Sequence, residues 1–128
     1  MADLETIQEY LDSADQWLTA AERAQGNEDN PAAFNALHAV ELIAKAAIKF
    51  KTGETYKTHR IGGAFGKFFR DELGKDICKE LNKKMMRYDG IRYPNGNPTT
   101  EAEAKEIVEF SKRFQEKITQ YIQDKEGS

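Results

Sequence analysis

Residues 30–51 read NPAAFNALHAVELIAKAAIKFK, and this stretch decides the fold. Apolar residues follow helical spacing on one side of the stretch, as at Ala36 and Val40, and a second apolar row that includes Leu37 follows another side. A helix that is apolar nearly all round is buried in the centre of a protein. The stretch therefore predicts a central helix with other helices packed around it.

The limits of this central helix are predicted by the residues at its two ends. Asn30 followed by Pro31 indicates a start, because an asparagine side chain can cap the first turn and proline lacks only an N–H that has no helical partner there. Gly53 indicates the end, since glycine readily takes the left-handed conformation that closes a helix. A polar connection then follows.

Apolar residues that recur every three or four positions predict four further helices. The last of them begins with Thr100 and Glu103, which form a capping-box pattern. The sequence contains no alternating strand pattern and no internal repeat. We therefore expect an all-α fold, an antiparallel up-down bundle of four to five helices that forms one domain over residues 1–128. The ranges expected for the other helices are about 4–26, 60–73, 77–90 and 100–121.

Composition excludes several classes of protein. Charged residues make up 32% of the 128 residues and hydrophobic ones 39%, which is typical of a globular protein. No apolar run is long enough to cross a membrane, and no leader precedes the first helix. The single cysteine, Cys78, excludes an internal disulfide and indicates the cytoplasm. The two histidines lack metal-ligand spacing, so we expect no metal and no cofactor.

The charge is distributed unevenly along the chain. Residues 1–30 hold eight acidic residues and one basic one, whereas residues 45–93 hold thirteen basic residues and six acidic ones. These charges can pair within the fold. Alternatively, the basic middle of the chain forms a surface that attracts phosphate, nucleic acid or an acidic partner.

Three polar residues interrupt the central helix on one side. His38, Glu41 and Lys45 share a helical stripe with Phe34 and Ile48. Glu41 precedes Lys45 by four positions, which is the favourable order for an ion pair within a helix. The stripe is therefore either a buried ion pair that fixes how the helices pack, or a groove where His38 or Lys45 meets a ligand.

Residues 85–98 read MMRYDGIRYPNGNP and place two arginines at the end of the fourth predicted helix. Arg87 and Arg92 are each followed by a tyrosine. Arginine makes bidentate contacts with phosphate, and tyrosine can stack on a base. The alternative is that both arginines cap this helix and pair with acidic residues of the last one.

The glycines of residues 62–69, GGAFGKFF, do not form a phosphate-binding P-loop. Lys67 is followed by Phe68 where a P-loop has serine or threonine, and no strand precedes the segment. The glycines instead lower the helix propensity of the third predicted helix.

Four short motifs, taken in order, resemble those of HEPN domain proteins, and the resemblance covers nearly the whole chain. It implies an all-α bundle that forms a homodimer and occurs in prokaryotes as a small stand-alone protein. It also implies a minimal nucleotidyltransferase as genomic partner, the two being similar to a toxin–antitoxin pair. The motifs are AVELIAK at residues 39–45, Thr58-His59, Arg92-Tyr93-Pro94, and the Glu103-Ala104 pair with Val108.

Many HEPN proteins are metal-independent ribonucleases in which an arginine is followed, a few positions later, by a histidine. Arg87 matches the arginine, but Arg92 stands where the histidine is required. Arginine stays protonated, so it can hold a phosphate but cannot accept a proton. The resemblance therefore implies a non-catalytic protein that binds a nucleotide or RNA phosphate, or a nucleotidyltransferase partner. Its candidate binding residues are Arg87, Arg92, Tyr93, His59, Lys45 and Glu41.

Two alternatives remain open at the level of sequence. In the first, the protein is a ribonuclease toxin in which His59 replaces the missing histidine and is supplied to Arg87 within the dimer. In the second, the polar residues only fix a dimer of bundles, and the protein is a structural dimerisation module.

Overall fold

The computed structural model describes residues 3–58, 61–92 and 98–127, apart from the side chains of Asp89 and Arg92. Within these ranges every regular element is an α-helix, so the predicted all-α bundle is confirmed. No helix in the described part of the chain is long and apolar enough to span a membrane. The five helices are α1 (Leu4–Ala24), α2 (Asp29–Thr52), α3 (Ile61–Leu73), α4 (Lys75–Arg92) and α5 (Glu101–Glu126).

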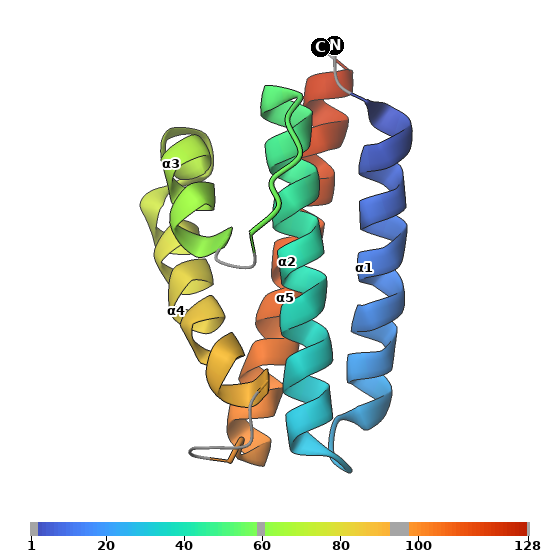
Figure 1. Ribbon diagram of the computed structural model, residues 1–128, viewed down its shortest axis with the longest axis vertical. Coiled ribbons are helices and arrows are strands. Elements are labelled where there is room, and N and C mark those ends of the chain that lie inside the picture. Colours follow the sequence, from blue (N-terminus) through green and yellow to red (C-terminus); the bar gives the residue numbers. More distant parts are fainter. Residues whose placement is uncertain (1–2, 59–60, 93–97, 128) are drawn as a thin grey trace.

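The central position predicted for the alanine-rich stretch is confirmed. Helix α2 packs along α1 and α5, and it also contacts α3 and α4 (Figure 1). Thirteen of its residues are buried, and they lie on several sides of the helix. Helices α3 and α4 form a pair of their own beside this three-helix group. The bundle therefore has two parts, α1–α2–α5 and α3–α4.

The chain reverses direction between consecutive helices, with one exception. Helices α1 and α2 run antiparallel, as do α3 and α4, and α4 and α5 (Figure 1). Between α2 and α3 the chain leaves the end of α2 and runs back along it, so α3 points the same way as α2. Helix α1 begins and α5 ends at the same end of the bundle, opposite the end where α4 finishes.

Small side chains bring α1, α2 and α5 together. Ala14 and Ala21 of α1 are fully buried, as is Ala36 of α2. The hydroxyl of Ser111 on α5 donates to the carbonyl oxygen of Ala36 at 3.2 Å and to that of Ile107 at 2.8 Å. The one buried hydroxyl in this contact is thus satisfied, as burial requires.

Glycine brings α3 and α4 together instead. A Cβ atom added at Gly62 would lie 2.6 Å from the Asn82 side-chain oxygen and 3.0 Å from its Cα, so only glycine fits there without a shift. Aromatic rings then attach this pair to the rest of the bundle. Phe65 of α3 stacks on Phe69 at 4.7 Å between ring centroids and meets Phe114 of α5 edge-on at 5.2 Å.

Most of the predicted helix ends are confirmed by backbone geometry. Gly53 closes α2 with a φ of 79°, and Gly74 separates α3 from α4 with a φ of 94°. Both values lie in the left-handed region that glycine adopts without steric cost. The Thr100 hydroxyl accepts from the Glu103 amide at 3.0 Å, so α5 begins with the predicted cap.

Several predicted helix limits differ from the structure. Helix α5 continues to Glu126 rather than ending at about 121, and α4 begins at Lys75 rather than at about 77. Helix α2 begins at Asp29 rather than after Asn30, because the Asn30 side chain accepts from the distant backbone amide of Thr99 at 3.1 Å instead of capping its own helix. Helix α4 continues past Gly90 to Arg92, because Gly90 does not adopt a positive φ. A Cβ atom at Gly90 would lie 2.8 Å from an Arg87 guanidinium nitrogen, so the glycine makes room for that side chain.

Candidate functional site at the contact of helices α2 and α4

The polar stripe of α2 forms a buried ion pair. Lys45 Nζ lies 2.8 Å from Glu41 Oε2, and the side chains of the two residues are 11% and 2% exposed. The ion pair predicted from the spacing of Glu41 and Lys45 is therefore present. Removing charges from water is costly, so each partner depends on the other to remain buried.

A histidine and a tyrosine join the same stripe to α4. His38 Nδ1 and the Tyr88 hydroxyl are 2.9 Å apart, and the tautomer of His38 decides which of the two donates. His38 Nδ1 also lies 4.0 Å from Glu41 Oε1. We call His38, Glu41, Lys45 and Tyr88 the α2–α4 polar cluster. It connects two helices that belong to the two parts of the bundle.

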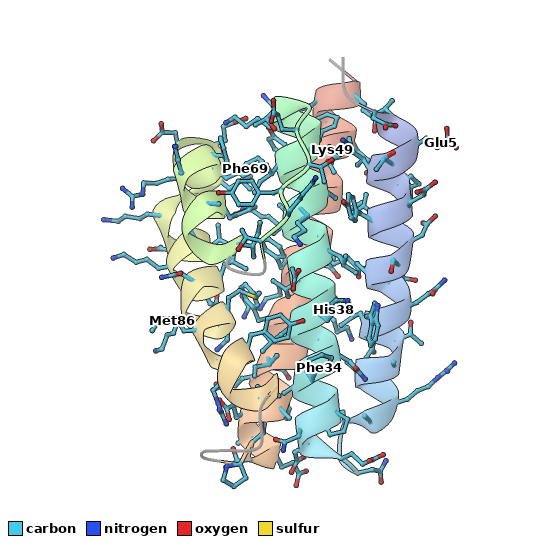
Figure 2. All side chains as sticks on the ribbon, viewed as in Figure 1. Glu5, Phe34, His38, Lys49, Phe69 and Met86 are labelled. Atoms are coloured by element: carbon cyan, nitrogen blue, oxygen red, sulfur yellow. The ribbon has the colours of Figure 1, made fainter. Side chains whose placement is uncertain are left out.

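Aromatic rings enclose the His38 side of this cluster. Trp17 of α1 meets the His38 ring edge-on at 4.6 Å between ring centroids. Phe34, which lies one turn before His38 on α2 (Figure 2), is parallel to it at 6.2 Å. Phe34 also packs against Tyr88 at 5.5 Å between centroids. Tyr88 is only 3% exposed. Its ring is therefore part of the core, and its hydroxyl is directed to His38.

Arg87 lies next to Tyr88 but is directed to α5. Its Nε donates to Glu103 Oε2 at 2.7 Å and its Nη2 donates to Glu103 Oε1 at 3.2 Å. This bidentate geometry matches the planar guanidinium to the planar carboxylate and fixes the arginine in place. The pairing of Arg87 with an acidic residue of the last helix, predicted as one alternative, is present.

Three candidate residues remain, Arg92, His59 and Tyr93. Arg92 is the last residue of α4. His59 and Tyr93 lie outside the described residues. The structure thus brings Glu41 and Lys45 together with His38 and Tyr88, and it places Arg87 on the adjoining face of α4. Among the described residues, no group of three or more His, Cys, Asp or Glu side chains could hold a metal ion.

Two partners in this site were missed from sequence. Tyr88 follows Arg87 directly but was not among the candidate residues, and its bond to His38 joins positions fifty residues apart. Glu103 belongs to the predicted capping box and to the last HEPN-like motif, but it was not among the candidate binding residues. Both residues lie in stretches named above, Tyr88 in residues 85–98 and Glu103 at the start of the last helix. Their partners could not be predicted, because no spacing rule links residues on different helices.

The sequence of this helical bundle matches a family model. The model for the HEPN domain matches residues 7–121, which is nearly the whole chain. The chain belongs to the HEPN family. No curated protein sequence matches it. In this HEPN domain the matched region contains the α2–α4 polar cluster, Arg87 and Arg92, so all of the candidate residues lie within the matched range.

A second group of charges lies at the other end of this HEPN domain. Lys51 of α2 and Lys125 of α5 both pair with Glu72 of α3, the latter at 3.5 Å. The hydrogen bond from Lys51 lowers the pKa of Glu72, against the effect of burial. Burial, helped by the nearby charge of Glu72, raises the pKa of Tyr121 to about 12. These groups tie α3 to α2 and α5.

Proposed function

We propose that the protein is a non-catalytic HEPN protein that binds the phosphate of a nucleotide or RNA at the carboxyl end of α4. The observation that carries the proposal is the pair Arg87 and Arg92, of which Arg87 is fixed by the bidentate contact with Glu103. Arg92 stands where the ribonucleases of the family have a histidine. A second arginine there supplies charge for a phosphate but no proton acceptor.

The two arginines have different roles in this proposal. Glu103 already balances the charge of Arg87 and fixes the direction of its guanidinium group. We therefore assign Arg87 a positioning role at the end of α4 rather than a direct contact with the ligand. Arg92 and Tyr93 are assigned the contacts with the ligand from their places in the sequence, and His59 is assigned to the same site. Glu41 and Lys45 pair within α2 beside His38, which bonds to Tyr88 of α4.

The proposed partners rest on the resemblance to HEPN proteins. We propose that the protein acts in the cytoplasm of a prokaryote as a homodimer with a minimal nucleotidyltransferase, in a toxin–antitoxin-like pair. The basic middle of the chain supports an acidic partner surface as the contact. Co-purification with a nucleotidyltransferase encoded next to this protein tests this part, and its absence from the complex contradicts it.

Titration calorimetry with ATP tests the ligand. We expect Arg92→Ala to weaken binding by about tenfold or more, because a charge-assisted hydrogen bond contributes about 1.5–3 kcal/mol. Lys105→Ala, which removes one exposed charge on α5, is the matched control and should leave the affinity nearly unchanged. Equal affinity of wild type and Arg92→Ala would count against the proposal.

Incubation with single-stranded RNA tests the absence of catalysis. The purified protein should leave the RNA intact, because its matching position lacks the proton acceptor that general base catalysis needs. Cleavage that disappears in Arg87→Ala and in His59→Ala would instead establish the ribonuclease alternative. If neither ATP nor RNA binds and only the dimer is found, the structural alternative is correct.

A further inference from the structure

A groove of about 520 Å³ lies between α3 and α4, and its described lining does not include Glu41, Lys45 or Arg87. Its cationic side chains come from both helices, and all four are exposed. Side chains with nitrogen tips extend from α3 and α4 on the side away from α2 (Figure 2). We call it the α3–α4 groove. Its cations are Lys67, Arg70, Lys75 and Lys79.

The charge of this groove is not balanced by its own lining. Asp71 is the one carboxylate among the described residues that line it. In the part of the chain that the structure describes, none of the four cations forms an ion pair within 4.0 Å. By contrast, Arg87 and Arg113 each make a bidentate contact with a glutamate on the neighbouring helix. The groove therefore keeps its positive charge available to an anion.

The base of the groove is open because its residues are small. Gly63 and Gly66 line it from α3, and a Cβ atom added at Gly63 would have no heavy atom within 4 Å. Cys78 lies at the base on α4, where burial raises the pKa of its thiol. The thiol therefore adds no negative charge. Asn82 adds an amide, which can donate to an oxygen.

We propose that the α3–α4 groove binds a chain of phosphates, as found in a nucleic-acid backbone or a polyphosphate. Cations on both sides of an open groove suit a ligand that carries several closely spaced charges. No aromatic ring is among the described lining residues, so base stacking has no platform there and binding should not depend on base sequence. An acidic peptide is disfavoured because the lining offers no apolar pocket for its side chains.

Fluorescence anisotropy with a labelled single-stranded DNA oligonucleotide at low salt tests the proposal. We expect the double variant Lys67→Glu/Lys79→Glu to weaken binding by at least about tenfold and to lower the slope of log K against log salt by about 1.4, the value for two lost phosphate contacts. The double variant Lys105→Glu/Lys117→Glu is the control, since it changes the net charge equally through exposed residues of α5. It should weaken binding much less.

A charge-neutral variant separates the groove from the overall charge. Gly63→Gln places a side chain into the open space without changing any charge, and it favours the helix because glycine has low helix propensity. We expect it to weaken DNA binding several-fold while the protein remains folded by circular dichroism. Unchanged binding by Gly63→Gln would overturn the groove as the site.

Competition identifies the class of ligand. Inorganic tripolyphosphate should displace the DNA, and this result would indicate a site for phosphate chains in general. If only nucleic acid displaces the DNA, the ligand is the sugar–phosphate backbone of a nucleic acid. Displacement by polyglutamate as readily as by tripolyphosphate overturns the proposal in favour of an acidic protein. So does a wild type that binds neither DNA nor tripolyphosphate.

The Arg92→Ala variant distinguishes this site from the proposed function. We expect it to bind the DNA oligonucleotide within about twofold of wild type, since Arg92 follows the lining residue Asn82 by ten positions on α4, which is about 15 Å along a helix. Loss of DNA binding in Arg92→Ala together with normal binding in Lys67→Glu/Lys79→Glu overturns the groove and leaves the proposed function intact. The reverse result supports the groove alone.

Discussion

Alanines bring α2 close to α1 and α5, whereas a glycine brings α3 close to α4, and the two parts of the bundle also use charge differently. In α1–α2–α5 the polar groups of Ser111 and Glu41 are buried and satisfied by partners, and Lys45, which pairs with Glu41, is largely covered. In α3–α4 four cations are exposed around a groove, while Glu72 and Arg87 pair with α2 and α5. The first part thus buries a group of polar side chains, and the second exposes a group of cations. Variants in each part should therefore fail in different ways.

The largest effect is expected where aromatic rings attach the two parts. Phe65→Ala should lower the free energy of unfolding by about 3–5 kcal/mol, because the ring is fully buried against Phe69 and Phe114. Chemical denaturation measures the loss, with Met86→Ala as control because Met86 is 75% exposed. Hydrogen exchange should show α3 and α4 opening before α1, α2 and α5. Uniform opening would mean that the two parts are not separable.

The next effect concerns the buried ion pair of α2. Lys45→Met should lower the free energy of unfolding by about 3 kcal/mol, because it leaves the Glu41 carboxylate buried beside an apolar side chain. Adding Glu41→Gln should recover part of the loss, which a double-mutant cycle by denaturant titration would measure. Lys105→Met, at an exposed position, is the control. Additive losses at the two positions would show that the charges are not coupled.

A smaller effect is expected at two neighbouring glycines of α3. Gly62→Ala should destabilise the protein by about 1–3 kcal/mol, because the new Cβ collides with Asn82 on α4. Gly63→Ala should stabilise it by about 0.5–1 kcal/mol, since its Cβ meets nothing and alanine favours the helix. Thermal unfolding of the two variants checks this opposite sign. The same sign for both would contradict the close approach of α3 and α4.

The smallest effect appears only at high pH. Tyr121 contacts Phe69 of α3 and has a pKa raised to about 12, mainly by burial. The unfolded chain ionises this phenol near its ordinary value of 10, so stability falls as the pH rises from about 10 to 12. Near pH 11 the loss is roughly 1 kcal/mol. Tyr121→Phe should lack this part of the decline in an alkaline denaturation series.

The fold was largely predictable because its signals are local. The near-continuous apolar character of α2 indicated a central helix, and Gly53, Gly74 and Thr100 indicated helix limits that the structure confirms. The errors have non-local causes. The Asn30 side chain accepts a hydrogen bond from the Thr99 amide instead of capping α2. Gly90 remains helical, and the Arg87 side chain lies beside it. Neither contact leaves a trace in the spacing of residues.

The candidate site was predictable only within single helices. The ion pair between Glu41 and Lys45 follows from a spacing of four residues on one helix. The bond between His38 and Tyr88 depends on how α2 and α4 are placed, which periodicity does not determine. The α3–α4 groove was missed for the same reason. Its glycines were interpreted as a weakness of the helix, although they open the groove and let the helices approach.

The single tryptophan of the chain, Trp17, packs edge-on against His38. All tryptophan fluorescence therefore originates beside the α2–α4 polar cluster, and none originates in α3 or α4. Its emission would report loosening around His38 and Tyr88 without any attached dye. A ligand that changes this emission acts near the cluster, whereas a ligand confined to the α3–α4 groove should leave it unchanged. The protein thus carries its own optical probe for telling its two proposed binding sites apart.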